Sequence, residues 1–203
     1  HTEVRRQRQM CIRDRPNTNP LTTTPEALEH KIKRGTETAY TDFAYYFGGT
    51  FENSKNLPLW EKLDGVCGIK IFMGASTGNL LSATDEEVEA VVANGNRVIA
   101  VHAEDEFLMN ENKKTILKDS NDVGMHCKWR DVNSSLNATK RVVSLAKKHN
   151  RHVHVLHITT AEEMDYLRNH KDTATVEVLP NHLTFHAPDC YEQLGTLAQQ
   201  NPP

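Results

Sequence analysis

Three apolar segments that carry basic side chains near their ends most constrain the fold of this chain. Short runs of this kind, rich in β-branched residues, predict buried strands, and helical patterns separate them. Alternation of strands with helices predicts an α/β fold with a parallel sheet. The segments read Gly68-Ile-Lys-Ile-Phe-Met73, Val98-Ile-Ala-Val-His-Ala-Glu104 and His152-Val-His-Val-Leu-His-Ile158.

The functional groups of a (β/α) barrel lie at the carboxyl ends of its strands. Lys70, His102 and His157 each stand near such an end. We therefore expect these three side chains to converge on one site, and two imidazoles with a buried lysine indicate a metal centre with hydrolytic chemistry.

Helix and turn signals fill the rest of the chain. Thr24 and Pro25 are typical of a helix N-terminus, and Thr84 and Thr160 each begin a capping-box pattern with glutamate three residues later. Further strands are expected at 41–47 and 173–179, helices at 131–149 and 188–198, and a long functional loop at 105–128. Five strands, four of them followed by helices, predict a partial (β/α)8 TIM barrel, incomplete at both ends, since a complete one needs about 250 residues.

The charge distribution divides the chain in two. Residues 1–15 contain five arginines and two acidic residues, without helical or strand periodicity. A basic arm that binds phosphate or RNA is one interpretation. We favour the other, an atypical segment foreign to the fold, and assign residues 16–203 to one partial barrel domain.

Composition narrows the class of protein. The 203 residues are 37% hydrophobic and 25% charged, with a net charge of -3, which gives no reason to expect nucleic acid or an anionic membrane as partner. There is no apolar run near the roughly 18 residues of a membrane helix and no secretory signal. The scattered cysteines predict free thiols in the cytoplasm; they are Cys11, Cys67, Cys127 and Cys190.

Lys70 has two interpretations from its apolar surroundings. An unpaired buried ammonium is costly, so the side chain either reaches the surface or pairs with an acid. Alternatively, a deprotonated lysine takes up carbon dioxide and becomes a carbamate that bridges two metals. Strict alternation places His152 and His154 on the face opposite His157, so we expect these two to be structural or solvent-exposed. Glu104, just after His102, is either a partner of the site or a solvated acid.

Several motifs together resemble one enzyme family. The ordered set resembles dihydroorotase of the cyclic-amidohydrolase superfamily, and it covers the chain from about residue 16 to its end. The motifs are Pro16-Asn-Thr-Asn-Pro20, Gly68-Ile-Lys-Ile-Phe-Met-Gly74, Val101-His-Ala-Glu-Asp105, Val155-Leu-His-Ile-Thr-Thr-Ala-Glu162, Glu177-Val-Leu-Pro-Asn-His-Leu183 and Asn201-Pro-Pro203.

The resemblance implies a role for each matched residue. Lys70 would be carboxylated and bridge two Zn²⁺ ions, with His102 and His157 on the second ion. Asn17 would hold the substrate carboxylate and Asn201 would contact the pyrimidine ring, while the role of His182 stays open. The implied reaction is the reversible cyclisation of N-carbamoyl-L-aspartate to dihydroorotate in pyrimidine synthesis.

The resemblance also implies residues that this chain lacks. A His-x-His pair would lie upstream and the catalytic aspartate beyond Pro203, so no catalytic residue is assigned and the chain by itself is expected to be inactive. Two alternatives remain: a hydantoinase, dihydropyrimidinase or allantoinase, and a non-catalytic scaffold of dihydroorotase type. A homodimer is compatible with either enzyme.

Overall fold

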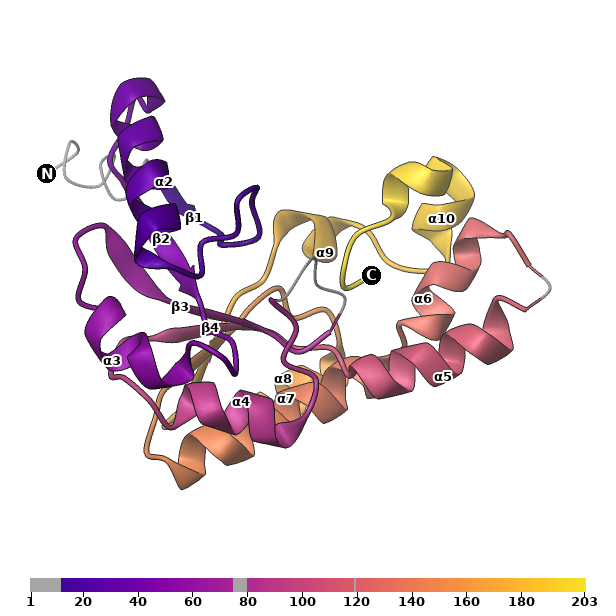
Figure 1. Cartoon of the computed structure of the whole chain (residues 1–203). Coiled ribbons are helices and arrows are strands. Elements are labelled where there is room, and N and C mark those ends of the chain that lie inside the picture. The colour runs from indigo at the N-terminus through magenta and orange to yellow at the C-terminus, as the bar shows by residue number, and fades with distance from the viewer. Residues whose placement is uncertain (1–11, 75–79, 119) are drawn as a thin grey trace, which may run out of the picture.

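A parallel sheet of six strands in chain order organises the molecule, which is described from a computed structural model (Figure 1). The structure describes residues 12–74, 80–118 and 120–203. The strands are β1 (Ile12–Asp14), β2 (Phe43–Gly48), β3 (Val66–Phe72), β4 (Ile99–His102), β5 (Val153–Val155) and β6 (Ala174–Val176). Every neighbouring pair is parallel, and each strand lies beside the next in sequence, as in a (β/α) barrel that stays open.

Helices follow most of the strands. The α-helices are α2 (Pro25–Thr38), α3 (Leu57–Trp60), α4 (Asp85–Val92), α5 (Glu106–Ile116), α6 (His126–Trp129), α7 (Val132–Lys148), α8 (Ala161–Leu167), α9 (Pro180–Thr184) and α10 (Asp189–Leu194). Short 3₁₀ turns are η1 (Ser54–Asn56), η3 (Val123–Met125) and η4 (Gly195–Ala198). In the part of the chain described, no helix is both long and apolar enough to cross a bilayer.

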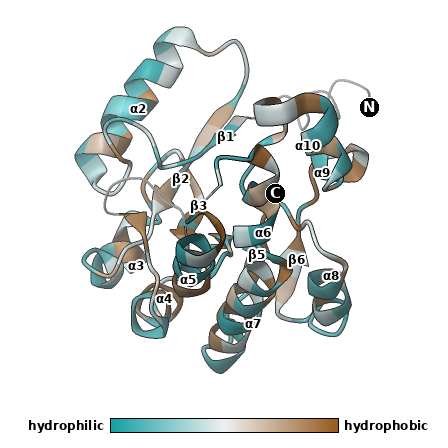
Figure 2. Cartoon of the chain, turned by 90° about the vertical axis from the view of Figure 1, so that its right-hand side faces the viewer, coloured by the Kyte–Doolittle hydropathy of each residue, from teal (hydrophilic) through white to brown (hydrophobic). Residues whose placement is uncertain are grey.

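The hydrophobic core lies between one face of the sheet and the helices α3, α4, α7 and α8, whose apolar sides turn inward (Figure 2). Alternate strand residues reach this layer, including Ile69 and Ile71 of β3 and Ile99 and Val101 of β4. The residues between them face the opposite, inner side of the sheet. Lys70 and His102 are therefore on the inner side, away from the helices.

The predicted helix starts are confirmed by their hydrogen bonds. The Thr24 side chain accepts from the backbone N–H of Ala27, and both hydrogen bonds of the capping box between Thr84 and Glu87 are present. Thr160 caps α8 through the N–H of Glu163, but the Glu163 carboxylate bonds the hydroxyls of Thr139 and Thr160 instead of closing a box.

Two expectations about elements were wrong. Residues 105–128 are largely helical, because Asp105 caps α5 by accepting from the N–H groups of Phe107 and Leu108. Residues 1–15 show no strand periodicity, yet Ile12–Asp14 form β1, which pairs with β2. Three residues are too few for periodicity to show. Residues 1–11 lie outside the described residues, so the domain boundary after residue 15 stays a prediction.

The carboxyl-terminal segment turns back over the molecule. In Figure 1, α9 and α10 lie on the same side of the molecule as α6, and the chain end lies between them. His126 makes the contact, with Nδ1 2.8 Å from the Tyr191 hydroxyl and Nε2 3.0 Å from Oδ1 of Asn201. The thiols of the described residues form no disulfide.

Candidate metal centre

The strand register brings the predicted site residues to one end of the sheet. Lys70 pairs with Ala100, and Phe72 pairs with His102, so Lys70 and His102 share the inner face. His157 follows β5 by two residues. Its Nε2 lies 3.0 Å from Nδ1 of His102, and the two ring planes meet at 71°.

His157 reaches this position because the backbone leaves extended geometry after β5. Its φ is +41°, a conformation that few residues other than glycine adopt. Its backbone N–H donates to Oε2 of Glu177 over 3.1 Å. This hydrogen bond to the residue just after β6 holds the turn, and the turn aims the imidazole at His102.

The strand register shows that the predicted facing of His154 was wrong. Ala100 pairs with His154, so His154 shares the inner face with Lys70 instead of lying opposite the site. It is half-buried, and its Nδ1 lies 2.9 Å from the Thr175 hydroxyl. Strict alternation fails because it assumes extended backbone as far as His157. His152 is exposed, as expected.

Lys70 is buried without compensation. Its side chain is 1% exposed, and Nζ has no hydrogen-bond partner among the described residues. Nζ lies 4.4 Å from the centre of the Phe72 ring. Burial, reinforced by the charge of Arg15 and opposed by Glu177, holds the pKa of Lys70 well below its usual value. The Lys70 ammonium group therefore neither reaches the surface nor pairs with an acid among the described residues, the two arrangements that would offset the cost of its burial.

Both imidazoles are in the state that binds metals. Burial lowers the pKa of His102, although Glu104 opposes the shift. Burial, together with the charges of His102 and Lys70, lowers the pKa of His157 to about 2. A neutral imidazole offers a lone pair, and ligands must be deprotonated to bind zinc.

The geometry also fits a shared metal ion. Two nitrogens on one tetrahedral zinc, each about 2.05 Å from the ion, stand roughly 3.3 Å apart, close to the 3.0 Å between His102 and His157. No group of three or more histidine, cysteine, aspartate or glutamate side chains gathers within the described parts of the chain. The residues present therefore fit part of a zinc centre, made by two imidazoles and the lysine.

Glu104 and Arg130 form a buried pair next to His102. Glu104 is fully buried, and Arg130 is 4% exposed. Nε of Arg130 donates to Oε1 of Glu104 over 3.0 Å, and a second guanidinium nitrogen contacts Oε2. Burial acts to raise the pKa of Glu104, but His102 and Arg130 outweigh it and the pKa is lowered. The carboxyl group is therefore an ionised carboxylate.

The predicted substrate-binding residues, Asn17 and Asn201, lie near opposite ends of the given sequence. Asn17 is half-buried in the loop that follows β1. Asn201 bonds His126. His182, in α9, places Nε2 3.2 Å from the Pro202 carbonyl and 2.8 Å from the Gln200 amide nitrogen. The structure thus brings Lys70, His102 and His157 together, and it anchors Asn201 through α6.

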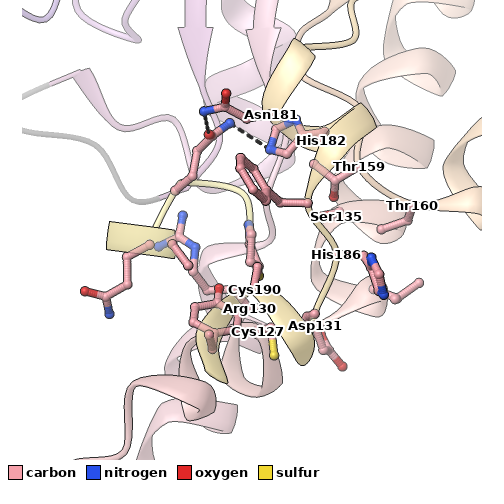
Figure 3. A pocket seen from close by; sticks show the side chains of 18 of the residues that line it. Cys127, Arg130, Asp131, Ser135, Thr159, Thr160, Asn181, His182, His186 and Cys190 are labelled. Carbon is pink, nitrogen blue, oxygen red and sulfur yellow. Dashed lines mark hydrogen bonds between the residues drawn. The ribbon is translucent and has the colours of Figure 1, made fainter. Parts of the chain in front are cut away.

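A cavity of about 590 Å³ is lined by His182 and Arg130, whereas Lys70, His102 and His157 are not among its described lining residues. Figure 3 shows Asn181 and His182 on one side of it, and Cys127, Arg130 and Cys190 on the other. The starts of α7 and α8 complete the wall. The sequence pattern does not single out Arg130 or His126, because both lie in or beside residues 105–128, for which it predicts a loop. The capping position of Asp105 was the available signal for a helix there.

Comparisons with known proteins give relatives over nearly the whole chain. A dihydroorotase of Methanosphaera stadtmanae is 29% identical over 95% of this chain and 44% of its own length. A dihydroorotase of Methanosarcina acetivorans is 31% identical over 94% and 42%. An allantoinase of Arabidopsis thaliana is 28% identical over 87% and 38%. No protein-family model matches the sequence.

Solved structures share the fold. The L-hydantoinase (dihydropyrimidinase) of Arthrobacter aurescens superposes with a TM-score of 0.86 at 25% identity, covering 96% of this chain and 44% of that protein. A D-hydantoinase gives a TM-score of 0.76 at 18% identity, over 91% of this chain and 42% of its own, which bears on the fold alone. The chain spans a little over two fifths of the relatives it matches. It is a homologue of the dihydroorotases and shares its fold with the hydantoinases.

Proposed function

We propose that the intact protein is a zinc-dependent dihydroorotase, which interconverts N-carbamoyl-L-aspartate and dihydroorotate in pyrimidine synthesis. The observation that carries the proposal is the 3.0 Å approach of the His102 and His157 nitrogens on the face that also buries Lys70 without a partner. Relatives named dihydroorotase support this choice of substrate. A cytoplasmic location and a homodimeric assembly belong to the same proposal.

Each residue has a defined part in this proposal. His102 and His157 hold one metal ion through their neutral nitrogens. The neutral Lys70 amine attacks the carbon of CO₂ and releases one proton, so that a neutral amine becomes an anionic carbamate that would be able to join two ions. When bound, zinc ions supply Lewis acidity toward the amide carbonyl and lower the pKa of water. Asn17 and Asn201 bind the substrate carboxylate and ring.

Proton transfer is left to a group outside the matched motifs. Opening of the ring adds water across the amide bond: oxygen goes to the carbonyl carbon and a proton to the departing nitrogen. Of the acids near the pair, Glu104 is already engaged by Arg130, and Glu177 accepts from the His157 backbone. The resemblance assigns this step to an aspartate beyond residue 203.

A hydantoinase or dihydropyrimidinase is the second candidate, because the L-hydantoinase of Arthrobacter aurescens superposes with a TM-score of 0.86. The allantoinase relative of Arabidopsis thaliana extends the same alternative. A non-catalytic scaffold is the third. The retained Lys70, His102 and His157 argue against it.

The test supplies the intact protein with Zn²⁺ and bicarbonate, and then offers N-carbamoyl-L-aspartate, dihydroorotate, hydantoin, dihydrouracil and allantoin separately. We expect turnover of the first two only, loss of activity on chelation and recovery with Zn²⁺. His102→Asn should lose bound zinc and activity together. Turnover of hydantoin alone would reverse the order of the candidates, and zinc-loaded protein inactive on every substrate would favour the scaffold.

A further inference from the structure

A buried carboxylate stands behind the candidate metal ligand His102. Oε2 of Glu104 lies 2.7 Å from Nε2 of His102, on the side of the ring away from Nδ1. Nδ1 in turn faces Nε2 of His157 at 3.0 Å. The imidazole is therefore placed between a carboxylate and the other candidate ligand.

This arrangement decides which ring nitrogen carries the proton. An ionised carboxylate only accepts hydrogen bonds, so the nitrogen that faces it must be the N–H. In a neutral imidazole the other nitrogen then carries the lone pair. Nε2 of His102 has no other hydrogen-bond partner among the described residues, and Oε2 of Glu104 at 2.7 Å is the acceptor that it faces.

Arg130 holds the carboxylate in place. It contacts both oxygens of Glu104, and its own guanidinium lies 4.9 Å from the centre of the Trp129 ring. Both side chains are at least nine-tenths buried, and a two-point guanidinium–carboxylate contact fixes orientation as well as charge. Arg130 stands between α6 and α7, 26 residues beyond Glu104.

We propose that Glu104 and Arg130 are positioning residues that hold His102 with Nε2 protonated and Nδ1 free to bind the metal ion. The inference rests on the proposed function, because it assigns a role toward the zinc centre. Carboxylate partners of metal-bound histidines orient the ring and raise its basicity, and their loss weakens metal affinity about 10- to 100-fold. Here an arginine from the segment between α6 and α7 orients that carboxylate.

A purely structural ion pair is the competing explanation, and the choice of variants separates the two. Glu104→Leu alone leaves Arg130 buried without a partner, which destabilises any fold. The double variant Glu104→Leu with Arg130→Met removes both charges and replaces them with apolar side chains of similar size. A structural pair predicts that the double variant regains both stability and zinc affinity.

We expect the double variant of the intact protein to unfold near the temperature of the unsubstituted protein but to bind Zn²⁺ about 10- to 100-fold more weakly, measured by competition with a chromophoric chelator. Nitrogen NMR of the histidine rings in chelator-treated protein should show one tautomer of His102 before substitution and a mixture afterwards. The matched control is Glu163→Gln, another carboxylate 2% exposed, whose oxygens bond Thr139 and Thr160. It should leave zinc affinity within about 2-fold.

Zinc affinity and His102 tautomer that stay unchanged in the double variant would overturn the inference and leave the proposed function standing. An equal loss of affinity in Glu163→Gln would also overturn it, because any buried carboxylate would then have the same effect. Failure of the unsubstituted protein to bind Zn²⁺ would overturn the proposed function itself, and the inference with it.

Discussion

Lys70 is a residue whose burial lowers the stability of the folded protein. Among the described residues, Lys31 and Lys70 are both buried, in very different surroundings. Lys31 donates to the Arg15 carbonyl over 2.7 Å and pairs with Asp14 at 2.8 Å, whereas Lys70 has no hydrogen-bond partner among the described residues. A buried polar group without a partner costs free energy, so its retention indicates a chemical role.

We predict that Lys70→Met raises the free energy of unfolding of the chelator-treated protein at pH 7. The folded pKa of Lys70 lies below the unfolded value of 10.5, so between these two values the unfolded state binds the extra proton and stability rises with pH. The gain from Lys70→Met should therefore shrink as the pH approaches 10.5. Chemical denaturation from pH 7 to pH 10 measures it.

Lys31→Met is the control for this prediction. It removes a lysine of similar burial whose hydrogen bonds are satisfied, and it should destabilise the protein. Equal destabilisation by the two substitutions would mean that the Lys70 amine has a partner in solution. The Lys70→Met protein should in addition retain less zinc than the unsubstituted protein, since it lacks the proposed bridging ligand.

At the scale of elements, the turn that joins α4 to β4 sets the start of the strand that carries His102. Gly95 has a φ of +79° there, and a Cβ on it would stand 2.4 Å from Oε2 of Glu61. Glu61 is 2% exposed, and its carboxylate accepts hydrogen bonds from the backbone N–H groups of Asn96 at 2.7 Å and Arg97 at 3.0 Å. The Glu61 carboxylate thus provides hydrogen-bond acceptors for two backbone N–H groups of the turn. Only glycine at position 95 leaves space for that carboxylate.

Gly95→Ala should lower the free energy of unfolding by about 1–3 kcal/mol, because it combines left-handed backbone strain with a displaced buried carboxylate. Urea denaturation of the intact protein measures the loss. Gly124→Ala is the control, since its nearest neighbour would be Asp122 at 3.4 Å and its φ is not in the left-handed region. The prediction fails if both substitutions cost the same.

At the scale of the whole molecule, the open sheet and the carboxyl-terminal segment leave apolar side chains in solvent. In the described residues, β1 and β6 each have a single strand neighbour. Leu183 is 73% exposed and Leu197 is 85% exposed. Exposed apolar side chains and open sheet edges favour association.

Replacing Leu183 and Leu197 with serine should change the unfolding free energy of this 203-residue chain by less than about 0.5 kcal/mol each. It should also shift the chain toward the monomer, measured by light scattering after size exclusion. The buried Leu28, 2% exposed, gives the contrast, because Leu28→Ser should unfold the chain. Unchanged association after both surface substitutions would place the contact elsewhere.

Much of this protein follows from sequence alone, because the signals involved are local. Strand and helix alternation, the cap at Thr24 and the box at Thr84 depend on residues within a turn of each other, and the structure confirms them. The placement of Lys70 and His102 on neighbouring strands, toward the same edge of the sheet, follows from the same reasoning.

The tertiary structure decided the features that join distant residues or depart from regular backbone. His157 reaches the site only because its backbone takes a φ of +41°, held by Glu177 twenty residues later. Arg130 reaches Glu104 only through the packing of α5, α6 and α7. No local periodicity encodes a left-handed residue or a contact across 26 residues. These details depend on the packed chain as a whole.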